Sequence, residues 1–253
     1  MGDLNAAIVA HGFVDPNDPV AISFWIISIS MVAATVFFLT ESATVSVHWK
    51  TSLNVGALVT LVAAVHYFYM REFWVQLHSS PILYRYIDWT ITVPLQMIEF
   101  YLILAAVKPD IGKGMFLRLL LGTVAMLMFG YAGEAKFVNP WVGFALGMAG
   151  WGFILYEIFM GEAGQVCGND PKVSQYVREA FSTMRFIVSV GWSIYPLGYF
   201  FGYLTGAVDD STLNLVYNLA DFVNKIAFCL AIWASAKSST LAGKEGALLA
   251  DHA

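Results

Sequence analysis

Apolar residues dominate seven long stretches of the chain, separated by short segments rich in proline, glycine and charged residues. The stretches cover residues 20–39, 53–69, 84–107, 115–132, 138–160, 177–204 and 211–235. A membrane-spanning helix needs about 20 apolar residues, and each stretch is close to that length. None shows the period-two alternation of a membrane barrel strand. The pattern therefore predicts an all-α membrane protein with a seven-transmembrane helix bundle.

The composition supports a membrane protein. The chain is 58% hydrophobic and 12% charged, and a soluble domain would carry roughly twice that charged share. Repeats, low-complexity tracts and long linkers are absent from the sequence, so we expect one domain. We expect residues 20–236 to form the bundle, residues 1–19 an extracellular segment and residues 237–253 a cytoplasmic tail.

Basic residues indicate the orientation of the bundle, because they gather on the cytoplasmic side of membrane proteins. With the N-terminus outside and the C-terminus inside, the outer side holds only Arg71 and Lys136. The cytoplasmic ends then hold Lys50, Lys108, Lys113, Arg118, Lys172, Arg178, Arg185, Lys237 and Lys244. We therefore expect an N-outside protein that crosses a bacterial inner membrane several times.

Several other functions find no support in the sequence. Cys167 and Cys229 fall on different predicted elements and offer neither a disulfide framework nor a metal-ligand spacing. The net charge is −5, without the basic cluster that nucleic-acid binding requires. The first 19 residues lack the basic and then apolar pattern of a signal peptide.

The last apolar stretch carries two ionisable residues, Asp221 and Lys225, one helical turn apart. Each costs about 2.5–3.5 kcal/mol at the centre of a membrane, so the two are expected to share a face and to pair. A buried lysine beside a carboxylate suits Schiff-base chemistry. An ion pair that only fixes helix packing is the alternative.

The third stretch is the richest in polar side chains. At about 100° per residue, five of them fall within roughly 80° of one helix face, which must line the bundle interior. They are Arg85, Asp88, Thr92, Gln96 and Glu99. Asp88 and Glu99 lie about 16 Å apart along the axis, and we expect Lys225 between them in depth. This order predicts a proton path across the membrane; for Thr92 alone, a packing hydrogen bond is the alternative.

Aromatic residues at helical spacing mark the sixth stretch, where Pro196 should kink the helix. Such flat side chains would wall a long, planar, apolar ligand. An ordinary core or an interface belt is the alternative. The aromatic set is Trp192, Tyr195 and Tyr199, with Trp89 and Trp151 added from other stretches.

These residues together resemble the microbial rhodopsins, most closely the proteorhodopsin group. Three motifs carry the resemblance, which covers roughly residues 20–235. They are Arg85-Tyr86-x-Asp88-Trp89, Trp192-x-x-Tyr195-Pro196 and Asp221-x-x-x-Lys225. The resemblance implies all-trans retinal, covalently bound to Lys225 as a protonated Schiff base.

The resemblance also implies a role for each polar group near that lysine. Asp88 matches the primary counterion and proton acceptor, Asp221 the second counterion, and Arg85 the arginine below the pair. The tyrosines that hydrogen-bond the second counterion are matched by Tyr67 and Tyr195.

His66 matches a histidine that pairs with the acceptor carboxylate and meets a tryptophan of a neighbouring protomer, for which Trp25 is the matching position. The resemblance thereby implies a homo-pentamer or homo-hexamer. From the residues alone, His66 would be satisfied by the backbone of a neighbouring helix.

The residues at positions 88, 92 and 99 look like those of a light-driven outward proton pump, with Glu99 as the proton donor. Gln96 resembles the tuning residue of blue-absorbing members. Its amide dipole beside the polyene would stabilise charge at the nitrogen in the ground state and widen the excitation gap. A slow-photocycle photosensory rhodopsin is the alternative, although no transducer is evident. A light-independent seven-helix transporter or receptor is a more distant one.

Paired outer glutamates, found in the bacteriorhodopsin pattern, have no match here, because Leu204 and Leu213 stand in their places. The loop residues Asp209 and Asp210 are interpreted as solvated. We therefore expect proton release late in the photocycle. Two further carboxylates, Glu134 and Glu157, are interpreted as packing or subunit-contact residues.

Overall fold

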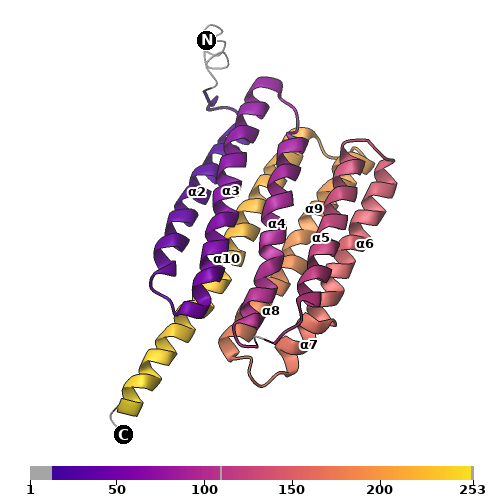
Figure 1. Cartoon of the computed structure of the whole chain (residues 1–253). Helices are drawn as coiled ribbons and strands as arrows, with labels where there is room; N and C mark the ends of the chain where they lie inside the picture. The colour runs from indigo at the N-terminus through magenta and orange to yellow at the C-terminus, as the bar shows by residue number, and fades with distance from the viewer. Residues whose placement is uncertain (1–12, 109, 252–253) are drawn as a thin grey trace.

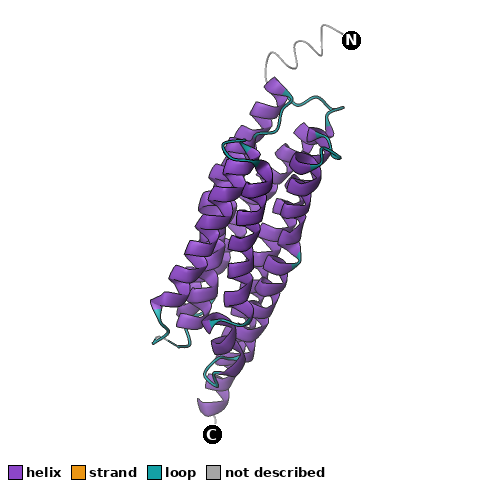
Figure 2. Ribbon diagram, turned by 90° about the vertical axis from the view of Figure 1, so that its right-hand side faces the viewer, coloured by secondary structure: helices purple, strands orange, loops and turns teal. Residues whose placement is uncertain are grey.

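The structure, a computed structural model, describes residues 13–108 and 110–251. Throughout this part of the chain the regular structure is helical, and the long helices form one bundle (Figures 1 and 2). The bundle helices are α2 (Pro19–Ser42), α3 (Val47–Leu77), α4 (Ile82–Ala105), α5 (Lys113–Glu134), α6 (Pro140–Phe159), α8 (Gln175–Ser189) with its continuation, and α10 (Asp210–Asp251). The prediction of a seven-helix bundle is confirmed. The short helix α7 (Glu162–Asn169) was not predicted.

Local capping rules set several helix starts. The Asp18 carboxylate accepts hydrogen bonds from the backbone N–H groups of Val20 and Ala21 at 3.0 Å, with Pro19 at the first helical position. Asn139 caps α6 in the same way, followed by Pro140. These pairs follow the preference for a polar cap and then proline, whose missing N–H costs nothing at that position.

The sixth span differs from a single helix. It continues from α8 through a 3₁₀ turn (η1, Gly191–Ser193), a short helix (α9, Ile194–Tyr199) and a π-helical turn (η2, Phe200–Leu204). Pro196 has no N–H to bond the carbonyl four residues earlier, and the 3₁₀ turn lies at that place. Six helices of the described chain are each long and apolar enough to cross a membrane. The remaining span is assembled from these consecutive pieces.

Two helices are longer than the apolar stretches that predicted them. α3 extends from residue 47 to 77, well beyond the predicted 53–69, because polar residues continue the helix where the apolar run stops. α10 runs to Asp251 and projects beyond the bundle (Figure 1), so the part of the predicted tail up to residue 251 is helical. Of the predicted N-terminal segment only residues 13–19 are described, and the Lys244 side chain lies outside the described part. The orientation remains a prediction.

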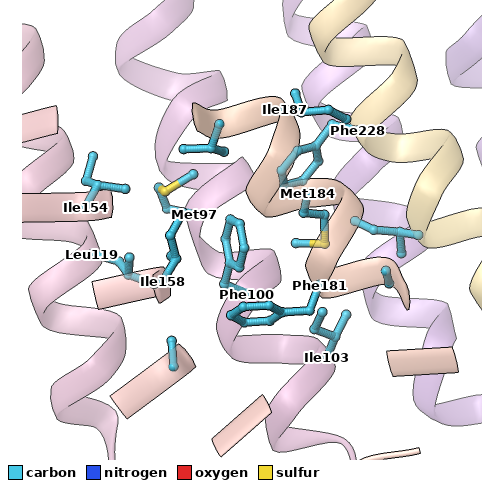
Figure 3. Close-up of a cluster of buried hydrophobic side chains, with 14 of the residues drawn as sticks. Met97, Phe100, Ile103, Leu119, Ile154, Ile158, Phe181, Met184, Ile187 and Phe228 are labelled. Atoms are coloured by element: carbon cyan, nitrogen blue, oxygen red, sulfur yellow. The ribbon is translucent and has the colours of Figure 1, made fainter. Parts of the chain in front are cut away.

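A cluster of buried apolar side chains joins α4, α5, α6, α8 and α10 (Figure 3). Phe100 of α4 contacts Phe181 of α8 and Phe228 of α10, with ring centroids 5.0 and 6.0 Å apart. Phe100 follows Glu99 directly, so the cluster lies on the face of α4 next to the one that carries the predicted inner carboxyl, about 100° around the helix. We call the set the inner cluster: Met97, Phe100, Ile103, Leu119, Ile154, Ile158, Phe181, Met184, Ile187 and Phe228.

Glycines let α5 and α6 approach each other closely. A Cβ atom on Gly143 would lie 2.6 Å from Cα of Gly133, and one on Gly150 would lie 2.6 Å from the backbone nitrogen of Met126. Close backbone contact through small residues is a common way of joining helices in membranes. The contact fixes the two helices that form one wall of the site.

Candidate active site around Lys225

The Lys225 ammonium lies between two buried carboxylates. Its Nζ is 2.5 Å from Asp88 Oδ2 on α4 and 2.8 Å from Asp221 Oδ2 on its own helix. Neither carboxylate residue has measurable exposure, and Lys225 is 2% exposed. The short distance to Asp88 places the nitrogen at the level of that residue. The expectation that Lys225 lies between Asp88 and Glu99 in depth stays a prediction.

Asp221 is saturated with hydrogen bonds. Its carboxylate accepts from the Tyr67 hydroxyl at 2.8 Å, the Tyr195 hydroxyl at 2.7 Å and the Trp89 indole nitrogen at 3.3 Å, as well as from Lys225. Donors aimed at a carboxylate favour its charged form. Asp221 is therefore built to stay an anion, and both predicted tyrosines lie on it.

Asp88 has fewer hydrogen-bond partners than Asp221. Its Oδ2 accepts from Lys225, while its Oδ1 is buried without a hydrogen-bond partner in the described chain. A carboxyl with one unoccupied oxygen can take a proton without breaking other hydrogen bonds. The two carboxylates therefore differ in the way that an acceptor and a permanent counterion must differ.

His66 lies beside Asp88 and also satisfies itself on its own helix. Its Nδ1 is 3.9 Å from Asp88 Oδ1 and 2.9 Å from the Val62 carbonyl oxygen. The alternative of a backbone partner thus holds, with the difference that the carbonyl belongs to α3 itself. The histidine is positioned to turn between the two partners.

Arg85 is buried on the side of Asp88 that leads toward the start of α4. It donates to Asn214 Oδ1 at 2.9 Å, to Asn218 Oδ1 at 3.0 Å and to the Tyr67 hydroxyl at 3.4 Å. The two asparagines were missed in the sequence. With Asp221 and Lys225 they occupy positions 214, 218, 221 and 225, a helical spacing that places all four within about 60° of one face. That polar stripe in an apolar stretch was the available signal.

Glu99 occupies a different environment, near Ser52 of α3 and Cys229 of α10. It is 1% exposed, and neither carboxyl oxygen has a hydrogen-bond partner in the described chain. The Ser52 side chain of α3 faces it without forming a hydrogen bond of good geometry. An unpartnered carboxylate anion is costly in such a place, so this group is held as the neutral acid.

Thr92 and Gln96 lie on the same face of α4 between the two carboxyls. The Thr92 hydroxyl donates to the backbone carbonyl of Asp88 at 3.0 Å, a hydrogen bond within α4 and not the one between helices that was the alternative for it. The Gln96 side chain lines the cavity described next, and its Nε2 is buried without a partner in the described chain. An orphaned amide donor aimed at a cavity points to a polar or charged occupant.

A largely apolar cavity opens beside Lys225, with about 800 Å³ of space not filled by atoms. The Trp151 indole donates to the Val188 carbonyl at 3.1 Å and the Tyr199 hydroxyl to the Pro140 carbonyl at 2.9 Å, so both rings are fixed. The cavity brings together most of the predicted binding residues: Trp89, Gln96, Trp151, Trp192, Tyr195, Pro196, Tyr199, Asp221 and Lys225.

Two glutamates interpreted as packing or subunit contacts differ from each other. Glu157 pairs with Arg118 at 2.7 Å and accepts from the Ala163 N–H, a packing role. Glu134 is buried, accepts a hydrogen bond from the Tyr86 hydroxyl at 2.8 Å and lies on the cavity wall. Its side chain faces the bundle interior, so it does not fit a contact between subunits.

The loop aspartates lie at the surface, as expected for solvated residues. Asp209 and Asp210 are exposed, and Asp209 accepts from the backbone N–H of Thr212 at 2.9 Å. This hydrogen bond lowers the pKa of the Asp209 carboxyl. Leu213 is buried beside them, so the place of a paired glutamate is apolar.

Comparison with known proteins agrees with this site. The profile of bacteriorhodopsin-like proteins matches residues 18–239. The blue-light absorbing proteorhodopsin of Gamma-proteobacterium Hot 75m4 is 49% identical over 226 residues, 88% of each chain. The green-light absorbing proteorhodopsin of Gamma-proteobacterium EBAC31A08 is 47% identical over 223 residues, again 88% of each.

Comparison with solved structures also finds similarity to a proteorhodopsin. The crystal structure of blue light-absorbing proteorhodopsin from Med12 has a TM-score of 0.76 and 46% identity, covering 88% of this chain and all of that one. The profile match to residues 18–239 contains every residue of the site. The chain belongs to the bacteriorhodopsin-like family.

Proposed function

We propose that this protein is a light-driven outward proton pump that absorbs blue light. The observation that carries the proposal is the asymmetry around Lys225. On one side its nitrogen touches Asp88, which can accept a proton. On the other side Glu99 is held as a neutral acid in an apolar environment. The similarity to blue-absorbing proteorhodopsins supports both the activity and the colour.

The cofactor proposed is retinal on Lys225, and the residues present fit it. The cavity next to Nζ is walled by the flat rings of Trp89, Trp151 and Trp192, as a planar polyene requires. The unpartnered amide of Gln96 lies on the same cavity. When bound as a Schiff base, retinal supplies a protonated nitrogen and a light-driven isomerisation.

The chain's own residues then move the proton. Asp88, already in hydrogen-bond contact with the Lys225 nitrogen, takes the proton from it. Asp221 keeps its four donors and remains the anion of the site. Glu99 gives its proton to the Lys225 nitrogen from the inner side and is refilled from the cytoplasm. Each charge moved against 100 mV stores about 2.3 kcal/mol.

Release to the outside is proposed to come late in the cycle. The loop carboxylates Asp209 and Asp210 are exposed, and Leu213 is apolar, so no outer pair of buried glutamates stands there. Asp88 must therefore lose its proton directly to the outer side. This happens only after Glu99 has reprotonated the nitrogen.

The bundle is proposed to sit in a bacterial inner membrane, with its N-terminus outside, as a homo-pentamer or homo-hexamer. An apolar groove on the lipid-facing surface supports a second copy as the neighbour. Trp25, Ile29, Leu61 and Phe68 line it, and the Arg71 guanidinium lies 4.9 Å from the Trp25 ring. His66 lies on the same helix as Leu61 and Phe68, so a neighbour in this groove would sit close to the Asp88 partner.

The test is the visible spectrum and the light-driven pH change of retinal-supplemented cells expressing the chain. Blue absorption with acidification of the medium, abolished by a protonophore, is the expected result. A pigment without pH change at any pH would favour a slow-photocycle photosensor. Absence of pigment would reject retinal binding and leave Lys225 with a structural ion pair.

A further inference from the structure

Arg85 is a buried cation without an ion pair. It is 3% exposed, yet no described carboxylate lies within 4.0 Å of its guanidinium, although Asp88 is only one helical turn away on the same helix. Its Nη2 bonds two neutral amide oxygens instead, those of Asn214 and Asn218. Buried arginines normally pair with carboxylates, so the choice of neutral partners needs a reason.

The two amides are themselves fixed in orientation. The Asn214 nitrogen donates to the Ser80 hydroxyl at 2.8 Å and to the Asp210 carbonyl at 2.7 Å. The Asn218 nitrogen donates to the Ser23 hydroxyl at 2.9 Å. Because the Asn214 nitrogen is committed to Ser80 and to a carbonyl of its own helix, and the Asn218 nitrogen to Ser23 of α2, each oxygen must face Arg85. The two amides of α10 are therefore held with their oxygens toward Arg85, and we call Asn214 and Asn218 the clamp.

We infer that Asn214 and Asn218 are positioning residues that hold the Arg85 guanidinium on the outer side of the Asp88–Asp221 pair, away from ion-pair distance. The inference rests on the proposed function and extends it. A guanidinium in contact with Asp88 would stabilise the carboxylate and oppose its protonation. A neutral clamp keeps the cation near enough to attract negative charge but leaves Asp88 free to accept a proton.

The titratable groups already present around these charges are kept in the leucine variants proposed below, whereas Asn214→Asp adds one carboxylate to them. Those that face Arg85 are Tyr67, Glu134, Tyr203, Tyr217 and Asp221. Those that face Asp88 are His66, Asp221 and Lys225. A change in the titration of Asp88 on altering residue 214 or 218 therefore reports on where the guanidinium lies.

The experiment measures the midpoint of the acid-induced red shift of the visible band, which reports protonation of Asp88. Asn214→Leu and Asn218→Leu each replace an amide acceptor with an apolar side chain of similar size. The guanidinium then moves toward the carboxylates and the midpoint falls, by about one pH unit when both substitutions are combined. The isosteric Asn214→Asp variant adds a carboxylate that pairs with Arg85. The midpoint should then rise by about one unit. Opposite signs distinguish a clamp from general loosening of the structure.

Asn54→Leu is the matched control, because Asn54 is exposed on α3 and takes no part in the clamp. It should leave the midpoint at its wild-type value. Midpoints that do not move, or that move in the same direction for the leucine and aspartate variants, would overturn the inference. If the leucine variants form no pigment, the isosteric aspartate variant decides alone, and an unchanged midpoint there overturns the clamp.

Failure of the proposed function looks different from failure of the clamp. Absence of pigment in the unaltered chain, or an acid red shift that persists in Asp88→Asn, would reject the function itself. A normal pigment and a normal acid transition with an insensitive clamp would reject the positioning role only.

Discussion

The two halves of the bundle on either side of Lys225 are built in opposite ways. On the outer half, the polar side chains are joined: Arg85 to two asparagines, and Asp221 to two tyrosines and a tryptophan. On the half that we propose faces the cytoplasm, Glu99 is buried near Ser52 and Cys229, with both oxygens unpartnered in the described chain. In the proposed function, the hydrogen-bonded half takes up the proton from the nitrogen, and the isolated Glu99 carboxyl later returns one. This difference between the two halves gives proton movement a preferred direction.

The largest effect is expected from removing the acceptor on the outer side. Asp88→Asn leaves the Lys225 nitrogen without a base in contact, so outward pumping should stop and the acid red shift should vanish. Light-driven pH change and a pH titration of the visible band measure these two losses. Asp209→Asn, an exposed loop change, is the matched control and should keep both. Normal pumping by Asp88→Asn would refute its assignment as acceptor.

The next largest effect is expected from the inner side. Glu99→Gln keeps the shape but has no proton to give, so return of the proton to the Lys225 nitrogen should slow by about 10²–10³-fold, the usual contribution of a positioned acid. Time-resolved absorption after a flash follows this step. Lowering the external pH should speed it in the variant, because protons must then arrive from the medium. A rate equal to that of the unaltered chain would remove Glu99 from the path.

A smaller effect concerns colour and not transport. Gln96→Leu removes the unpartnered amide from the cavity wall, so the ground state loses stabilisation of charge at the nitrogen and the band should move to longer wavelength. The excitation energy should change by about 2 kcal/mol, the size of one hydrogen bond to a charged group. Gln76→Leu, on the exposed end of α3, is the control for pigment yield. An unmoved absorption maximum would contradict the electrostatic explanation.

The smallest effect is expected at Ser52, the hydroxyl that faces Glu99 from α3. Because no hydrogen bond of good geometry joins the two, Ser52→Ala should alter the rate of the Glu99 step by less than about tenfold, the limit for one neutral hydrogen bond. Flash spectroscopy under the conditions used for Glu99→Gln measures it. A slowing as large as that of Glu99→Gln would mean that the inner carboxyl is not isolated.

Most residues that distinguish the two halves could be predicted from the sequence, because a polar residue inside a membrane is costly and therefore points to a site. The face of Arg85, Asp88, Thr92, Gln96 and Glu99 follows from helical periodicity alone, and all five are buried in the structure. Hydropathy also marked the seven spans. It could not give helix ends such as those of α3 and α10, since helices continue past the membrane where polar residues still favour helix.

The parts that escaped prediction depend on packing between elements. The inward turn of Glu134 depends on the Tyr86 hydroxyl of another helix. The two asparagines that hold Arg85 carried a readable signal, their spacing to Asp221 and Lys225. Uncharged amides nevertheless attract less notice than carboxylates in an apolar stretch.

The most direct test of the directional contrast is the photocurrent of purified protein in vesicles of known orientation, supplied with retinal and recorded after a single flash. The expected record is a fast charge displacement toward the outer side, as Asp88 takes the proton, followed by a slower one of the same sign that Glu99→Gln delays. A displacement toward the cytoplasm, or a signal that decays to zero net charge in each cycle, would contradict an outward pump.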